Sequence, residues 1–311
     1  MYIGEKEEGT MESPLALFSH ELAGLVAKVS PSVVAVDGRR RTHSSGVHWR
    51  DGLVITAEHT LRRDEEIFVS MPGATIPAAL VGRDPGSDIA LLKVEGLSVP
   101  PIDLGVTAES HVGDVVLVVG RSPNSGPNAS MGIISAISGP WRTWRGGELD
   151  QYVRLDASVF PGSSGGAVID FRGQFLGIAT SALSRVAGLA LPVSNIRSVV
   201  DVLVEKGSIP RGYIGVALQP VPVPDSFRDK LSIKNGHGIM VLSVEDGGPA
   251  DKGGILIGDI MFEIEGKTVE SPEELQSMLG WKNVGKSVRT KVIRGGVIKE
   301  LVLAVEERKR R

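Results

Sequence analysis

The chain has 311 residues, of which 41% are hydrophobic and 5% aromatic, with 39 glycines. This length predicts two or three domains, and the glycine-rich, small-aliphatic composition favours a mainly β fold. The net charge of −3 gives no reason to expect nucleic acid or an anionic membrane as a partner, and the absence of cysteine excludes disulfide and thiol chemistry.

The N-terminal segment, residues 1–30, predicts a helix and no targeting signal. Residues 1–10 include four Glu or Lys side chains and no apolar core, and the chain has no run of 18 apolar residues that would span a membrane. As written, the chain is therefore expected to be soluble and cytoplasmic. From Leu15 to Val29 apolar residues recur every three or four positions after Pro14, which predicts an amphipathic helix. This helix either docks on the next domain or meets another subunit.

Two further domains follow in the predicted organisation. Between residues 31 and 206, short β-rich runs are separated by Gly, Pro, Asn and Asp, and their number suits two six-stranded barrels. A helical pattern near 196–206 closes this region, and residues 207–212 are the best linker candidate. In the small domain at 211–307, Ser271, Pro272 and Glu274 form an N-cap pattern that predicts a helix over 272–279.

The glycine-rich stretch Gly162-Ser163-Ser164-Gly165-Gly166 combines a nucleophile with backbone freedom. Ser164 is the proposed nucleophile, and such a hydroxyl requires a histidine as general base and a carboxylate to orient that histidine. The oxyanion hole is predicted at Gly162, Ser163 and Ser164, with the amides of Gly162 and Ser164 directed at one spot where they stabilise the oxyanion of a tetrahedral intermediate.

His59 and Asp88 are the predicted base and orienting carboxylate. His59 follows an apolar strand at the point where a loop begins, whereas His48 lies inside a predicted hairpin and His43 in a basic turn. Asp84 is assigned to a turn because it precedes Pro85-Gly86. The chain order His, Asp, Ser is that of chymotrypsin-like proteases.

With these motifs the chain resembles the HtrA/Deg serine proteases from about Leu22 to Val305. The matching motifs are Ser45-Gly46 before 51–59, the segment 84–94, the nucleophile loop 161–166, Leu191 to Asn195, and two small-domain signatures at 211–216 and 248–259. Two departures lie beside the catalytic residues. Ser163 replaces the usual Asn before the nucleophile, and Glu58-His59-Thr60 replaces the usual Asn-His-Val.

The resemblance implies a chymotrypsin-like double β-barrel protease domain followed by one PDZ domain. It also implies ATP-independent endoproteolysis of unfolded or damaged proteins, and a homotrimer built through the N-terminal segment. Family members normally carry an export signal or membrane anchor, so a periplasmic or envelope location is the alternative to the cytoplasm.

Residues near the nucleophile suggest the cleavage specificity. Ser158 lies where trypsin-like enzymes keep a carboxylate for Lys or Arg, and Val159, Thr180 and Ala182 are small or apolar. A basic side chain would be desolvated there without a partner. We therefore expect cleavage after small or medium aliphatic residues such as Val, Ala or Ile.

The PDZ signature implies a second binding site. Successive amides of Tyr213-Ile214-Gly215-Val216 are predicted to hold the C-terminal carboxylate of a peptide that adds as a strand beside residues 216–218, against a helix bearing Leu275 and Met278.

Two functions remain open from the sequence: an active quality-control protease, and a chaperone-like or scaffold module that binds unfolded chains without cutting them. The glycine- and proline-rich stretches 121–127 and 139–147 are candidates for mobile elements that would switch the protease between such states. With no metal cluster or nucleotide-binding fingerprint in the sequence, no cofactor is expected.

Overall fold

The computed structural model describes residues 13–39, 42–105, 109–210, 212–223, 225, 227–228 and 236–307. The chain divides into two compact units, the first ending at Ser208 and the second beginning at Ile209. Residues 1–10, in which no targeting signal is predicted, lie outside the described residues. Arg211 of the PDZ signature also lies outside them.

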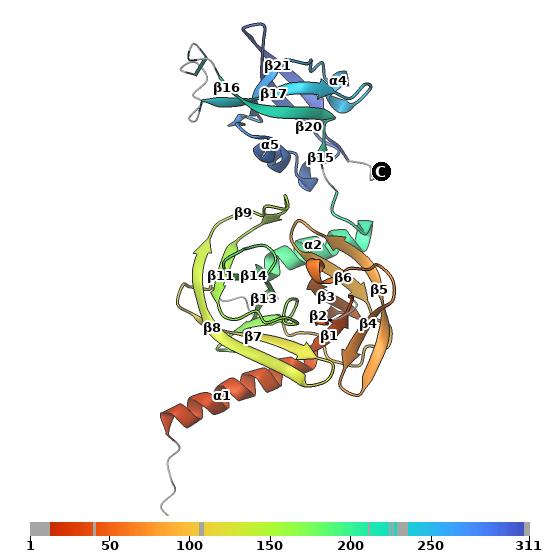
Figure 1. Cartoon of the computed structure of the whole chain (residues 1–311), viewed down its shortest axis with the longest axis vertical. Coiled ribbons are helices and arrows are strands. Elements are labelled where there is room, and N and C mark those ends of the chain that lie inside the picture. The colour runs from red at the N-terminus through yellow and green to blue at the C-terminus, as the bar shows by residue number, and fades with distance from the viewer. Residues whose placement is uncertain are drawn as a thin grey trace, which may run out of the picture. The chain divides into compact units, whose positions relative to one another are not determined.

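The first barrel is closed by six antiparallel strands in the order β1-β2-β3-β6-β5-β4 (Figure 1). They are β1 (Val33–Asp37), β2 (Ser44–Arg50), β3 (Leu53–Ala57), β4 (Ile67–Met71), β5 (Ala74–Asp84) and β6 (Ile89–Lys93). Branched aliphatic residues on alternate positions, such as Val34 and Val36 on β1, fill its interior. His59 follows β3 and Asp88 precedes β6.

The second barrel has the strand order β11-β14-β13-β12-β7-β8. Its strands are β7 (Val115–Ser122), β8 (Gly126–Ser138), β11 (Tyr152–Asp156), β12 (Ala167–Asp170), β13 (Phe175–Thr180) and β14 (Gly188–Pro192). A two-stranded sheet of β9 (Trp141–Arg142) and β10 (Glu148–Leu149) interrupts the connection from β8 to β11. The two six-stranded barrels predicted from the sequence are therefore confirmed, and Ser164 follows β11 in the second.

Two helices flank the barrels. α1 (Pro14–Val29) begins at Ser13, whose hydroxyl accepts a hydrogen bond from the Ala16 amide, and only Val29 of this helix is buried. α2 (Val193–Lys206) packs against strands of both barrels, β5 and β6 in the first and β13 and β14 in the second. It ends at Gly207 in the left-handed conformation, as the Lys-Gly pair predicted. Within the described ranges, no helix is long and apolar enough to cross a membrane.

The second unit is a small β domain whose main sheet has the order β16-β17-β18-β20-β21. Its strands are β15 (Gly212–Tyr213), β16 (Val216–Pro222), β17 (His237–Val244), β18 (Ile260–Ile264), β19 (Lys267–Thr268), β20 (Ser287–Arg294), β21 (Val297–Ala304) and β22 (Glu306–Glu307). Its described part also contains the helices α4 (Pro249–Lys252) and α5 (Pro272–Met278) and the 3₁₀ helix Trp281–Asn283. Since β16 lies at the edge of the sheet and α5 packs beside it, the unit has an edge at which a further strand can pair.

Candidate active site

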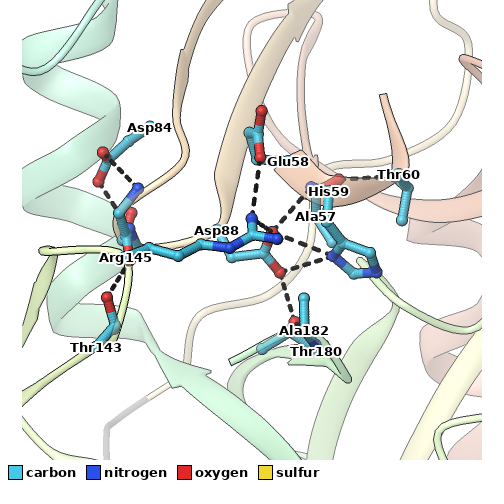
Figure 2. A network of polar contacts seen from close by, with 12 residues as sticks. Ala57, Glu58, His59, Thr60, Asp84, Asp88, Thr143, Arg145, Thr180 and Ala182 are labelled. Carbon is cyan, nitrogen blue, oxygen red and sulfur yellow. Dashed lines mark hydrogen bonds and ion pairs between the residues drawn. The ribbon is translucent and has the colours of Figure 1, made fainter. Parts of the chain in front are cut away.

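His59 and Asp88 lie together at one end of the first barrel (Figure 2). The His59 ring, in the 3₁₀ turn Glu58–Thr60, has its Nδ1 atom 2.9 Å from Asp88 Oδ2 and 3.1 Å from Oδ1. The His59 backbone amide also donates to Asp88 Oδ1 at 2.8 Å. Because the carboxylate faces Nδ1, the opposite nitrogen, Nε2, is left to exchange a proton with a nucleophile.

Asp88 is held by groups from both barrels. Its side chain is 0% exposed, and its backbone adopts φ +61° in the turn between β5 and β6. The hydroxyl of Thr180, at the end of β13, donates to Asp88 Oδ2. Asp84, four residues earlier, accepts from the amides of Gly86 and Ser87 at 3.0 Å each, which is the turn role predicted for it.

The nucleophile loop rests on the strands that lead to His59. The amide of Ser45 in β2 donates to the Ser164 carbonyl at 3.0 Å, and the Ser45 hydroxyl donates to the Gly162 carbonyl at 2.7 Å. A methyl group at Gly165, where φ is +85°, would lie 2.2 Å from Ser45 O and 2.7 Å from Thr56 Oγ1. Glycine is therefore required beside Ser164, because the loop packs directly on β2 and β3.

The Ser164 hydroxyl lies 3.2 Å from Ser181 Oγ, and no hydrogen bond joins it to His59 in the described part of the chain. Ser181 follows Thr180, which holds Asp88, so the segment that orients the carboxylate also contacts the Ser164 hydroxyl. Apo serine proteases often have long catalytic hydrogen bonds that tighten only with substrate. For attack, the hydroxyl has to turn from Ser181 to His59 Nε2.

The backbone amides of Gly162 and Ser164 donate to no other described residue, whereas that of Ser163 between them donates to the Phe160 carbonyl at 2.9 Å. Gly162 has φ +98°, a conformation that favours glycine. Two unpaired amides on either side of a paired one are the arrangement needed to receive an oxyanion. Ser163 was also predicted for the oxyanion hole, but its amide is already bonded to Phe160 and its hydroxyl donates to Asn128 Oδ1 at 3.0 Å, so this amide does not receive the oxyanion.

Four residues are predicted to line the specificity pocket, and the structure gives one of them, Thr180, a different role. Ser158 is exposed and Val159 packs against Gly188, where a methyl group would lie 2.5 Å from Val159 Cγ2. Thr180 is fully buried with its hydroxyl on Asp88, so it orients the carboxylate. The Ala182 carbonyl accepts from Trp144 Nε1 at 3.4 Å.

A charged cluster beside Asp88 was not found from the sequence. Arg145 Nη1 lies 3.4 Å from Glu58 Oε2 and 3.8 Å from Asp88 Oδ1 (Figure 2). Arg83 Nη1 lies 3.5 Å from Glu58 Oε1. Burial, together with the Asp88 carboxylate, raises the pKa of Glu58, and Arg83, Arg145 and His59 offset this only in part. A charged Glu58 directly before His59 was the one feature of the sequence that pointed to this cluster. The part played by Arg145 could not be predicted, because Arg145 lies 87 positions away from Glu58.

His43, assigned from the sequence to a basic turn, lies beside the oxyanion loop. A methyl group at Gly162 would be 3.1 Å from His43 Nε2. Burial and the neighbouring Arg39 lower the pKa of the His43 imidazole, so the neutral ring is favoured beside Gly162. His48, in contrast, is structural: its Nδ1 lies 2.8 Å from the Val99 carbonyl and its Nε2 accepts from the Gly52 amide.

The second unit holds the four residues of the predicted carboxylate site in one turn. Ile214 is buried and Gly215 has φ +79°, and the carbonyls of both are bonded, to the amides of Ala250 and Glu245 at 2.8 Å. The Ile214 and Gly215 amides donate to no described residue. Val216 begins the edge strand β16 and packs with Leu275 and Met278 of α5. The Tyr213 hydroxyl donates to Glu245 Oε2.

Two protein families match separate parts of the chain. Residues 44–178 match the trypsin-like peptidase domain, and residues 212–305 match the PDZ domain. The first match includes His59, Asp88 and Ser164, and the second includes the turn at Tyr213 to Val216.

Curated relatives and solved structures resemble the chain over most of its length. A probable periplasmic serine endoprotease, DegP-like, from Halomonas elongata is 30% identical over 307 residues, which are 96% of this chain and 64% of the relative. The corresponding DegP-like protein of Brucella suis is 35% identical, with coverages of 72% and 44%. The chain thus spans about half to two thirds of these relatives.

Among solved structures, the serine endoprotease from Yersinia pestis superposes with a TM-score of 0.72 at 30% identity. The superposition covers 92% of this chain and 98% of the Yersinia pestis chain. The HtrA-type protease AlgW, solved with a decapeptide, has a TM-score of 0.73 at 26% identity, with coverages of 93% and 99%.

The raised pKa of Glu58 predicts how stability depends on pH. Between the ordinary pKa of 4.5 and its raised pKa in the folded chain, Glu58 keeps a proton that the unfolded chain has lost, so in this range the group lowers the free energy of unfolding as the pH rises. Glu58→Gln in a Ser164→Ala background removes that dependence. In urea unfolding from pH 4.5 to 7, the stability of the glutamate protein relative to the glutamine variant should fall with pH. A constant or rising difference would contradict the assignment.

Proposed function

Because the chain belongs to the HtrA/Deg family of chymotrypsin-like serine proteases, with a trypsin-like peptidase domain and a PDZ domain, we propose that it is an ATP-independent serine endopeptidase acting on unfolded or damaged proteins. One observation carries the proposal. Asp88 is bonded to His59 Nδ1, and in the loop that carries Ser164 the amides of Gly162 and Ser164 donate to no described residue. We assign the protease domain to residues 31–206, the PDZ domain to 211–307 and an N-terminal segment to 1–30.

The proposed mechanism gives a role to Ser164, His59 and Asp88 and to the two amides. The Ser164 hydroxyl attacks the scissile carbonyl carbon as its proton passes to His59 Nε2, and Asp88, held by Thr180, stabilises the resulting imidazolium. The carbonyl oxygen becomes an anion that the Gly162 and Ser164 amides bind. The carbon–nitrogen bond then breaks, the imidazolium protonates the leaving amine, and water releases the acyl group by the same steps in reverse.

The proposed substrate preference is cleavage after small or medium aliphatic residues. Val159 is partly buried against Gly188, and the pocket residues Ser158, Val159 and Ala182 carry no charge for a basic side chain. At the PDZ domain, we propose that hydrophobic C-terminal peptides pair with the open edge of β16 while their carboxylate meets the Ile214 and Gly215 amides.

The proposed oligomer is a homotrimer joined through α1. Leu15, Leu17 and Phe18 in its first turns are 77%, 51% and 46% exposed, so the helix presents apolar side chains with no partner in the described chain. The curated relatives are named as periplasmic proteins. We therefore propose the periplasm or cell envelope rather than the cytoplasm expected from the sequence as written.

Hydrolysis of an unfolded model protein tests the activity. Purified chain should cut casein, and Ser164→Ala should reduce the rate by more than about a thousandfold because it removes the nucleophile. Mass spectrometry of the fragments should place Val, Ala or Ile before the cut. Cleavage mainly after Lys or Arg would refute the pocket assignment. If neither protein cuts, even with a hydrophobic C-terminal peptide present, the non-proteolytic binding module takes the place of the protease.

The PDZ assignment predicts binding that depends on a free carboxylate. A fluorescent peptide with a hydrophobic C-terminus should bind Ser164→Ala at least about tenfold more tightly than its C-terminal amide, which lacks the anion that the turn amides receive. Gly215→Ala should weaken binding, because its methyl group would press on Glu245. Gly247→Ala is the matched control, a glycine of similar φ with open space around it. Equal affinity for acid and amide would rule out the site.

Light scattering after size exclusion tests the oligomer. The full chain should elute as a trimer, and Leu15→Glu with Phe18→Glu should convert it to a monomer because charge replaces the apolar contact surface of α1. Val297→Glu, at an apolar residue 60% exposed in the second unit, should leave the trimer intact. A monomeric wild-type chain, or a trimer insensitive to the α1 changes, would contradict the proposal.

A further inference from the structure

Arg145 and Glu58 are two opposite charges beside the Asp88–His59 pair, and we propose that they are positioning residues that balance the charge around the catalytic histidine. Neither touches a reacting atom, so both act through Asp88 and His59. The inference rests on the proposed function, because it concerns the same histidine and carboxylate.

The guanidinium of Arg145 lies between two carboxylates. Its Nη1 atom is 3.4 Å from Glu58 Oε2 and 3.8 Å from Asp88 Oδ1, and Figure 2 shows the side chain extending from its loop to this position. The side chains of Arg145 and Glu58 are 25% and 11% exposed, so water screens their charges less than on an open surface. Asp88 therefore has a cation and an anion as near neighbours besides His59.

The loop that carries Arg145 is docked on the turn that carries Asp88. The buried Thr143 hydroxyl donates to the Gly86 carbonyl at 2.7 Å and accepts from the Gly147 amide at 3.0 Å. A methyl group at Gly147 would lie 2.2 Å from the Gly86 carbonyl carbon. Since the two backbones are in direct contact two residues from both Arg145 and Asp88, the position of the arginine is fixed relative to the carboxylate.

The other charged residues near Asp88 have partners of their own, so Arg145 and Glu58 are the pair that acts on His59. The Asp84 carboxylate accepts hydrogen bonds from the amides of its own turn. Arg83 also contacts Glu58, at 3.5 Å, but it pairs with Asp64 as well. Within the described chain, Arg145 is therefore the cation closest to Asp88, and Glu58 is the anion that offsets it.

The two charges have opposite effects on proton transfer. Attack by Ser164 produces an imidazolium, which the cation of Arg145 disfavours and the anion of Glu58 favours. With both present, the sum of their effects is small, and Asp88 remains the group that stabilises the imidazolium. Removing one charge alone shifts the balance, whereas removing both restores it.

The pH dependence of peptide hydrolysis tests this balance. In Arg145→Gln the acid side of the kcat/KM profile should move to higher pH, and in Glu58→Gln to lower pH, each by at least about half a pH unit, a shift that one nearby charge produces even when water screens it fully. The double variant should return close to the wild-type profile. Arg145→Lys, which keeps the charge, should stay near wild type even where Arg145→Gln is poorly folded.

The control is a second arginine–carboxylate pair of the same unit, far out on the surface. Arg50 and Asp201 lie 2.7 Å apart with side chains 52% and 66% exposed, and Arg50→Gln and Asp201→Asn should leave the profile unmoved. Shifts of Arg145→Gln and Glu58→Gln in the same direction, no shift, or a double variant displaced as far as a single one would overturn the proposal.

A readout independent of proteolysis separates this inference from the proposed function. In a Ser164→Ala background, the His59 ring signal is followed by NMR against pH and is identified by its loss in His59→Ala. The titration midpoint should rise with Arg145→Gln and fall with Glu58→Gln whether or not the wild-type chain cuts casein. Midpoints that do not move would overturn the charge balance, whereas opposite shifts in a chain that cuts nothing would refute only the protease assignment.

Discussion

A carboxylate with no access to water determines how the first unit is built around its centre. Burying an ionised Asp88 costs several kcal/mol unless hydrogen bonds and opposite charges compensate. The compensating groups come from three places in the chain: the amide and ring of His59 after β3, the Thr180 hydroxyl at the end of β13, and Arg145 from the loop beyond β9. Satisfying one charge thus brings both barrels and one long loop to the same point.

A second set of contacts fixes the nucleophile against the same point. Ser45 uses its amide and its hydroxyl on the backbone of the nucleophile loop, and its carbonyl accepts from the Thr56 hydroxyl at 2.6 Å. Gly165 can pack there because it has no side chain. These bonds join β2 and β3 of the first barrel to the loop of the second, so the peptide groups of Gly162 and Ser164 are oriented by the same strands that lead to His59. Orientation fixed before substrate binds is what electrostatic stabilisation of an oxyanion requires.

Much of this could be predicted from the sequence because local patterns specify local structure. Apolar alternation and turn residues predicted two barrels, the capping pattern at Ser271 predicted α5, and Asp84-Pro85-Gly86 predicted a turn. The positions of Thr180 and Arg145 on Asp88 could not be predicted, since they come from residues 92 and 57 positions away. The burial of Ser44, Ser45 and His48 in β2 was likewise not predicted, because it depends on hydrogen bonds to the backbone of Val36, Gly162 and Val99.

The central claim is that Ser164 is a nucleophile activated by His59 and Asp88, and covalent labelling measures this directly. A fluorophosphonate forms a bond to the activated serine oxygen and loses fluoride, and the adduct is located by mass spectrometry of the digested protein. We expect one label on Ser164 in the wild-type chain, and at least about a hundredfold slower labelling in His59→Ala because the general base is lost. A label on Ser163 or Ser181 instead, or equal rates with and without His59, would contradict the account.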